Sequence, residues 1–160
     1  MIFPNDNFKD VMSTIPSCVG IVWVKVNETQ TLGCTVSSFI SISVALDDET
    51  VGFILKNNSR TGESIETCET FNISILGEQQ SEIAKVFAAG KSPQEIDLFL
   101  RTQEGWESHT ICNFVLSYKK KHVENFSTIY IANVISSTPI VGIKPLIYRH
   151  RKFYSEVFTD

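Results

Sequence analysis

Apolar residues in this chain alternate with polar ones, or run in short blocks between turn residues. Over windows of about four to eight residues, this pattern predicts β-strands. We expect strands at residues 18–26, 51–55, 70–76, 113–118, 127–136 and 145–148. The stretch 33–43, which reads GCTVSSFISIS, predicts two short strands that meet at a bend, and residues 44–46 are expected to continue as strand.

Helices are expected where apolar residues recur three and four positions apart, at 6–14, 61–68 and 78–89. A further helix should begin at Ser92-Pro93, because serine is a good cap and proline fits the first helical position. Its expected apolar face is Ile96, Leu98, Phe99 and Leu100. Many strands with short turns and few helices predict a mainly β fold, an antiparallel barrel with peripheral helices.

Composition narrows the function classes. The chain has 160 residues, enough for one domain with a sizeable core, and its net charge of −4 disfavours nucleic acid as a partner. No apolar run reaches the roughly 20 residues of a membrane helix, and Met1–Asp6 lacks the basic region of a signal peptide. Four widely spaced cysteines without a C-x-x-C pair indicate reduced thiols and a cytoplasmic location. The three histidines lack metal-ligand spacing, so no metal site is expected.

A candidate anion site follows the apolar run 51–55. The segment Asn58-Ser59-Arg60-Thr61 places a capping hydroxyl and a fixed positive charge at an expected helix start. Free backbone N–H groups at such a start bind phosphates well. By itself the segment is most simply explained as an ordinary helix cap with an exposed arginine.

Several ordered motifs together resemble the flavin reductase-like domain family, the FMN-binding split barrels. The matching residues are Gly33-Cys34-Thr35-Val36-Ser37-Ser38-Phe39, Asn58-Ser59-Arg60-Thr61, Phe71–Leu76, Phe87-Ala88, Pro145-Leu146-Ile147-Tyr148 and Tyr154. The resemblance covers nearly the whole chain. It implies one domain over residues 1–160 with an antiparallel Greek-key split β-barrel.

The resemblance implies an NAD(P)H-dependent flavin reductase that binds FMN, or FAD, and uses NAD(P)H as co-substrate. It also implies a homodimer, and a flavin-dependent monooxygenase as the partner that receives reduced flavin. An alternative is an FMN-binding flavoprotein, an electron carrier or flavin store, without strong NAD(P)H activity. A barrel that binds another planar ligand is a third reading.

Site residues also follow from the resemblance. Thr35, Val36, Ser37 and Ser38 are expected along the isoalloxazine ring, and Asn58, Ser59, Arg60 and Thr61 around the phosphate. Tyr148 and Tyr154 are expected near the flavin or the nicotinamide, although aromatic residues at a barrel edge explain them as well. Trp106 and Phe99 are candidates for covering the cofactor or for a dimer contact.

One departure from the family pattern bears on the enzyme class. Many members carry a Gly-Asp-His turn where this chain has Asn125, Phe126 and Ser127, so no catalytic residue is assigned. His122 lies a few residues upstream. The run 119–122, KKKH, is a candidate for contact with an NADPH phosphate, or a charged turn at a sheet edge.

Overall fold

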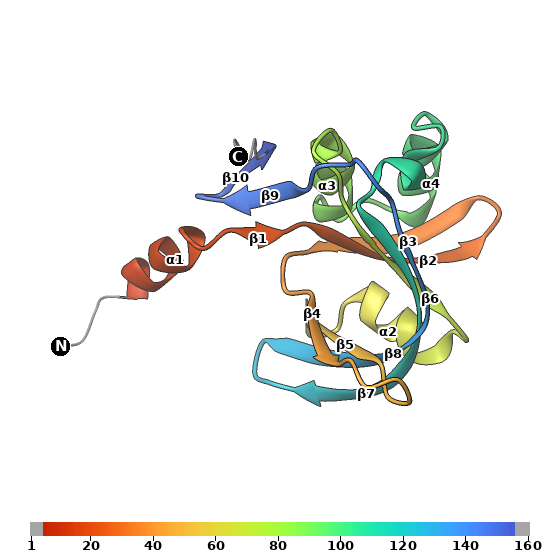
Figure 1. Cartoon of the computed structure of the whole chain (residues 1–160), viewed down its shortest axis with the longest axis horizontal. Helices are drawn as coiled ribbons and strands as arrows, with labels where there is room; N and C mark the ends of the chain where they lie inside the picture. The colour runs from red at the N-terminus through yellow and green to blue at the C-terminus, as the bar shows by residue number, and fades with distance from the viewer. Residues whose placement is uncertain (1–4, 156–160) are drawn as a thin grey trace.

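The computed structural model describes residues 5–155, with side chains from Phe8 onward (Figure 1). Residues 1–4, which carry most of the expectation about a signal peptide, lie outside this range, as do residues 156–160.

Ten strands, four α-helices and one short 3₁₀ helix make up the described part. In chain order they are α1 (Asn5–Ser13), β1 (Ser17–Cys18), β2 (Gly20–Asn27), β3 (Gln30–Val36), β4 (Ile40–Ser43), β5 (Thr50–Lys56), α2 (Arg60–Thr67), β6 (Phe71–Ile75), α3 (Ser81–Ala88), α4 (Pro93–Arg101), η1 (Trp106–His109), β7 (Cys112–Val123), β8 (Ser127–Pro139), β9 (Leu146–Arg149) and β10 (Lys152–Ser155). No helix within residues 5–155 is long and apolar enough to cross a membrane.

A seven-stranded antiparallel sheet forms the body, with strand order β3-β2-β6-β7-β8-β5-β4. A small second sheet has the order β1-β9-β10. The large sheet curls around α2, while α3 and α4 lie on the outer side of β2 and β3 (Figure 1). The mainly β antiparallel fold is therefore confirmed. The barrel is not closed, because the edge strands β3 and β4 follow each other in the chain but are not paired.

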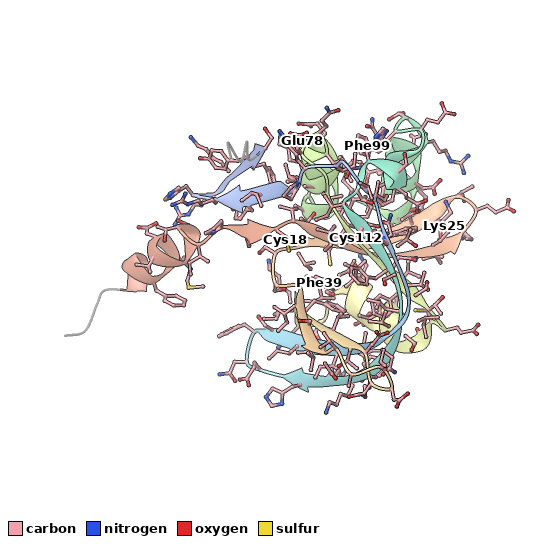
Figure 2. All side chains as sticks on the ribbon, in the orientation of Figure 1. Cys18, Lys25, Phe39, Glu78, Phe99 and Cys112 are labelled. Atoms are coloured by element: carbon pink, nitrogen blue, oxygen red, sulfur yellow. The ribbon has the colours of Figure 1, made fainter. Side chains whose placement is uncertain are left out.

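Two apolar cores hold the layers together. The first fills the curled sheet and includes Phe53, Phe71 and Leu116, each almost fully buried. Phe39, from the bend between β3 and β4, packs on Phe114 of β7 with ring centroids 5.1 Å apart and closes one side of this core (Figure 2). The second core lies between the large sheet and α3 and α4, and Phe99 packs against it (Figure 2).

Three expectations about strands need correction. The strand expected over 18–26 is interrupted at Val19, because β1 leaves the large sheet and pairs with β9. Residues 44–46 are not a strand, since the pairing of β4 with β5 stops at Ser43; Leu46 is 92% exposed. The lysine-rich run 119–122 belongs to the long strand β7, not to a turn.

Helix α4 has the expected cap, with Ser92 and Glu95 forming reciprocal hydrogen bonds. Its buried face differs from the expectation, because Leu98 is 68% exposed whereas Asp97 is buried. The Asp97 carboxylate accepts hydrogen bonds from Lys25 at 2.5 Å, Arg101 at 2.8 Å and Thr31 at 3.1 Å. A buried carboxylate is tolerated when its oxygens are satisfied in this way.

We expect Asp97→Asn to reduce the acid sensitivity of folding. Hydrogen bonds from Lys25 and then Arg101 lower the pKa of Asp97 to about 2, below the value of about 3.9 for an unfolded aspartate. Because the folded-state pKa is the lower one, this stabilisation is complete above about pH 4 and is lost as the pH falls through about 2. Urea-unfolding midpoints at several pH values from 6 to 2 (about one unit apart) should therefore fall more steeply for the wild type than for Asp97→Asn. Parallel curves would contradict the prediction.

Candidate functional site

The start of α2 presents a well-formed helix cap. Ser59 has extended backbone angles, and its hydroxyl accepts a hydrogen bond from the Gly62 N–H at 2.9 Å. Asn58 before it has φ 57°, in the left-handed region that asparagine tolerates better than most residues. This turn redirects the chain from the end of β5 into α2. The first turn of α2 therefore begins four residues after the end of β5.

A cavity of about 390 Å³ adjoins this helix start. Its wall is formed by β3, the end of β5, the first residues of α2, the last residues of α3 and the loop after α3. The residues that line it are Leu32, Gly33, Cys34, Thr35, Ile54, Leu55, Lys56, Ser59, Arg60, Thr61, Phe87, Ala88, Gly90 and Lys91. We call it the α2 cavity. It contains Thr35, Ser59, Arg60 and Thr61 of the residues predicted from the sequence.

The charge of the α2 cavity has one sign. Lys56, Arg60 and Lys91 line it, and no Asp or Glu is among the described residues of its wall. The Arg60 guanidinium reaches across to the Lys91 backbone carbonyl, which accepts a hydrogen bond at 3.3 Å. Only Lys91 of the three has a described carboxylate within ion-pair distance, Glu95 at 3.8 Å. Three cations beside a helix start attract an anionic group.

The cavity exists because the barrel is open on this side. Strand β4 pairs only with residues Thr50 to Gly52 of β5, so the later residues of β5 have a free edge towards β3. The Ser38 hydroxyl partly satisfies this edge by accepting a hydrogen bond from the Ile54 N–H at 2.9 Å. The bend at residues 37–39 thus connects the end of β3 to the free edge of β5.

Two side chains of β3 in the cavity wall are held by their neighbours. The Thr35 hydroxyl donates a hydrogen bond to the Ala84 carbonyl of α3 at 2.6 Å. Burial raises the pKa of the Cys34 thiol to about 11, and a hydrogen bond from Thr61 offsets only part of this effect. Cys34 therefore stays a neutral thiol near pH 7 and is a poor nucleophile.

The other predicted residues are divided between different places. Ser37, Ser38 and Tyr148 line a second cavity of about 920 Å³, between α1, the bend after β3 and strand β9. Val36 is buried in the first core and presents no side chain to either cavity. Asn58 is exposed in the loop before α2, and Tyr154 of β10 lines neither cavity. Of the ten expected residues, the structure thus brings Thr35, Ser59, Arg60 and Thr61 to the α2 cavity and Ser37, Ser38 and Tyr148 to the second one.

The turn that replaces Gly-Asp-His lies beside the phosphate loop. The Asn57 N–H donates to the Phe126 carbonyl at 3.2 Å, and the Asn57 side-chain amide donates to the Glu124 carbonyl at 2.8 Å. Ser127 is the strand partner of Lys56, which lines the α2 cavity. His122 is exposed and contacts Glu124 at 2.7 Å, and it does not line the cavity.

Two of the three lysines in the run 119–121 are engaged elsewhere. Lys119 forms an ion pair with Asp48 at 2.5 Å, and Lys121 forms one with Glu66 at 2.7 Å. This pairing disfavours a phosphate site at the run. Trp106 packs against Trp23, with ring centroids 5.5 Å apart, and neither it nor Phe99 lines the α2 cavity.

Sequence reasoning missed Lys56, Phe87, Ala88 and Lys91 as parts of the cavity wall. Lys56 directly precedes the phosphate-type loop, which is a signal that could have identified it. Lys91 comes 31 residues after Arg60 and is brought to it by α3 and the turn at Gly90, which has φ 66°. No local pattern reports that approach. Within residues 5–155, no group of three or more His, Cys, Asp or Glu residues is placed to hold a metal ion.

Comparison with known proteins adds to this geometry. A family model described as "Flavin reductase like domain" matches residues 12–156. No curated protein matches the sequence.

Several solved structures share the fold of this chain. NADH:FAD oxidoreductase SgcE6 of Streptomyces globisporus C-1027 has a TM-score of 0.81 at 20% identity, covering 100% of this chain and 98% of its own. SgcE6 has also been solved with NAD and FAD fragments, with a TM-score of 0.80, 19% identity, and 99% and 98% coverage.

The styrene monooxygenase flavin reductase of Pseudomonas putida S12 has a TM-score of 0.78 at 20% identity, with 96% and 99% coverage. BorF, the flavin reductase component of a bacterial two-component tryptophan halogenase, has a TM-score of 0.79 at 16% identity, with 96% and 100% coverage. At these identities the likeness establishes the fold.

Proposed function

The chain belongs to the family of flavin reductase-like domains, and from this membership we propose that it is an NAD(P)H:flavin oxidoreductase whose flavin phosphate binds in the α2 cavity. The observation that carries the proposal is the cationic wall of that cavity beside the start of α2. Family membership supports the enzyme class, and the charge of the cavity supports the proposed position of the flavin phosphate.

The residues of the α2 cavity fit a flavin phosphate. Arg60 can offer two parallel N–H donors to the phosphate oxygens, and Lys56 and Lys91 add charge from the two sides of the cavity. In the first turn of α2, the N–H groups of Gly62 and Glu63 are bonded to Ser59, which leaves those of Arg60 and Thr61 as the donors that a helix start offers to an anion. Ser59 keeps this turn in shape, because its hydroxyl is already bound to the Gly62 N–H.

The flavin ring would lie along β3 towards the second cavity. Because β3 is an edge strand, the backbone groups on its free side have no strand partner and can bond the polar edge of the ring. The Thr35 hydroxyl already donates to Ala84, so its contribution to a ligand is as an acceptor. Ser37, Ser38 and Tyr148 would border the far end of the ring. A bound flavin supplies the hydride acceptor, and the protein supplies its orientation and exclusion of water.

We propose the nicotinamide co-substrate and the partner protein by analogy with the structurally similar proteins. SgcE6 is named an NADH:FAD oxidoreductase, and BorF is named the reductase component of a two-component system. By analogy, we assign NAD(P)H as the co-substrate of this chain and a separate flavin-dependent monooxygenase as the acceptor of its reduced flavin. We propose FMN as the flavin, because the cations of the α2 cavity can bind its one phosphate. FAD is the alternative, because it carries a phosphate at the same position of the flavin.

The test is an anaerobic titration of the purified protein. FMN is added, then NADH or NADPH, and the flavin band at about 450 nm is followed. We expect bleaching far faster than in a protein-free control. FMN binding without bleaching would instead support the flavoprotein without nicotinamide chemistry, and Ser127→His would then be examined. Absence of flavin binding would rule out both readings.

A homodimer is part of the proposal, with α1 as the contact surface. Phe8, Val11 and Met12 of α1, and Ile15 just after it, are all about half exposed or more. Helix α1 projects from the body and carries one wall of the second cavity (Figure 1). An exposed apolar surface of this kind is typical of an interface, and a second copy seated there would shield the flavin from water.

We expect the double change Phe8→Asp with Ile15→Asp to convert a dimer to a monomer, because two carboxylates would be desolvated in the contact. Light scattering coupled to size-exclusion chromatography measures the mass. Val141→Asp is a matched control, since Val141 is 96% exposed in the loop between β8 and β9. A wild-type protein that is monomeric at all concentrations would refute the dimer.

The cytoplasm is the proposed location. All four cysteines are free thiols, as is usual in a reducing compartment. Cell fractionation with an antibody against the chain would check it, and recovery in a secreted fraction would oppose it.

A further inference from the structure

Helix α2, which presents the phosphate site, has only eight residues, Arg60 to Thr67. A helix of that length is unstable alone in water, so contacts with the rest of the fold must fix its position. Ile65 supplies one such contact because it is fully buried in the first core. Thr61 and Gly62 at the start of the helix are also buried, and polar contacts at its two ends add to this packing in setting the rotation of the helix about its own axis.

Tyr130 of β8 contacts the first turn of α2. A Cβ atom placed on Gly62 would lie 2.5 Å from the Tyr130 hydroxyl oxygen and 3.1 Å from the Ser59 Oγ. The hydroxyl therefore packs directly against the turn whose cap is Ser59. The Tyr130 ring is itself fixed, since it is buried and stacks on Phe53 with centroids 5.6 Å apart and planes 12° apart.

The same hydroxyl also contacts the last turn of α2. It donates a hydrogen bond to the Glu66 carboxylate at 3.0 Å. Both Glu66 oxygens accept hydrogen bonds from Lys121 of β7 at 2.7 Å. Two neighbouring strands of the large sheet thus hold both ends of α2 through one carboxylate and one phenol.

Tyr130 and Lys121 keep their protons near neutral pH. Burial raises the pKa of the Tyr130 phenol most, and the hydrogen bond to Glu66 raises it further. The phenol therefore keeps its proton and remains a donor. The hydrogen bond to Glu66 raises the pKa of Lys121, which stays a cation. The two donors of these contacts are therefore unchanged near neutral pH.

We propose that Tyr130, Glu66 and Lys121, here named the α2 clamp, are positioning residues for the flavin phosphate. They touch neither the α2 cavity nor, by this geometry, the flavin. They act by holding the Ser59–Gly62 turn and Arg60 at the angle at which a phosphate meets several donors at once. The inference rests on the proposed function, because it needs a phosphate in the α2 cavity.

Such positioning matters because a helix start attracts an anionic group only over a short distance. The favourable field falls off within the first turn, and charge-assisted hydrogen bonds weaken when donors are misaligned. A small rotation of α2 would thus weaken phosphate binding while the ring contacts of β3 remain. This difference separates positioning from general stability.

The experiment compares the dissociation constants of FMN and riboflavin, which share the ring but differ in the phosphate. Tyr130→Phe removes only the hydroxyl, and Glu66→Ala removes both of its contacts. We expect each to weaken FMN binding by about tenfold and riboflavin binding by less than about twofold. The kcat at saturating FMN should stay within about twofold of the wild type, while the KM for FMN rises.

Two further variants separate this role from loss of stability. Thr31→Val removes another hydrogen bond to a carboxylate, Asp97, outside the α2 cavity, and should weaken FMN and riboflavin binding equally or not at all. Glu66→Gln keeps an acceptor for Tyr130 and should bind FMN more tightly than Glu66→Ala. Thermal unfolding of each variant, followed by circular dichroism, confirms that the compared proteins are folded.

The outcomes are distinct. Equal weakening of both ligands in the clamp variants, or no weakening, overturns the positioning role and leaves the reductase intact. A wild-type protein that binds FMN no more tightly than riboflavin overturns the phosphate assignment, and the clamp inference with it.

Discussion

Arg60→Ala should weaken FMN binding by about 10- to 100-fold, the largest functional effect that we expect from one substitution in this chain. The estimate follows from a net value of about 1.5–3 kcal/mol for a hydrogen bond to a charged group. Arg60 lines the α2 cavity at the helix start and has no described carboxylate within ion-pair distance that would occupy its guanidinium. Its contact with the Lys91 carbonyl fixes the side chain across the cavity, so it is already placed for a phosphate.

The measurement is equilibrium titration of FMN by fluorescence, with riboflavin in parallel. Riboflavin affinity should be nearly unchanged, because only the phosphate contact is lost. Arg60→Lys should bind with intermediate affinity, since it keeps the charge without the planar pair of donors. Lys85→Ala serves as a control, because Lys85 is an exposed cation that pairs with Glu82 and does not line the cavity. If Arg60→Ala binds FMN like the wild type, the phosphate lies elsewhere.

Gly33→Ala should destabilise the fold by about 3 kcal/mol and deform the α2 cavity. A Cβ atom on Gly33 would lie 2.7 Å from the Phe87 ring and 2.7 Å from the Val22 backbone oxygen. Real Cβ contacts are not that short, so β3 and α3 must move apart. The backbone oxygen belongs to the paired strand β2 and cannot yield without loss of sheet hydrogen bonds. The usual small gain of alanine over glycine in a strand does not offset this.

Urea unfolding monitored by tryptophan fluorescence gives the free energy of unfolding for this variant. Gly20→Ala is the matched control on the neighbouring strand. Its Cβ atom would lie 3.1 Å from the terminal carbon of Ile75, a flexible side-chain end, so the expected cost is well under half of that at Gly33. Equal stability of the two variants would show that the β3–α3 contact adapts more easily than the packing indicates.

Local features of the chain were predictable because their causes lie within a few residues. The cap of α4 at Ser92, with Glu95, and the cap of α2 at Ser59 both act over three residues, so the sequence indicates them directly. The bend between β3 and β4 was predictable for the same reason. The ordered motifs also led to the family, which the family model over residues 12–156 confirms.

Contacts between distant segments were not predictable in the same way. Asp97 reads as a solvent-facing residue of α4, and only its approach to Lys25, 72 positions away, makes its burial favourable. The sequence predicts one strand over residues 18–26, yet Cys18 belongs to β1, which pairs with β9, because pairing partners are set by the whole sheet.

By itself, the sequence of this protein determined most strands of the large sheet and the helix caps at Ser59 and Ser92, since backbone preferences and capping bonds act over one or two turns. Only the tertiary structure decided that Thr35, Lys56, Arg60 and Lys91 share one cavity, while Ser37, Ser38 and Tyr148 line another. That division depends on where the sheet stays open between β3 and β5. The opening arises from long-range strand pairing, whose energy is spread over many weak contacts and leaves no local pattern in the chain.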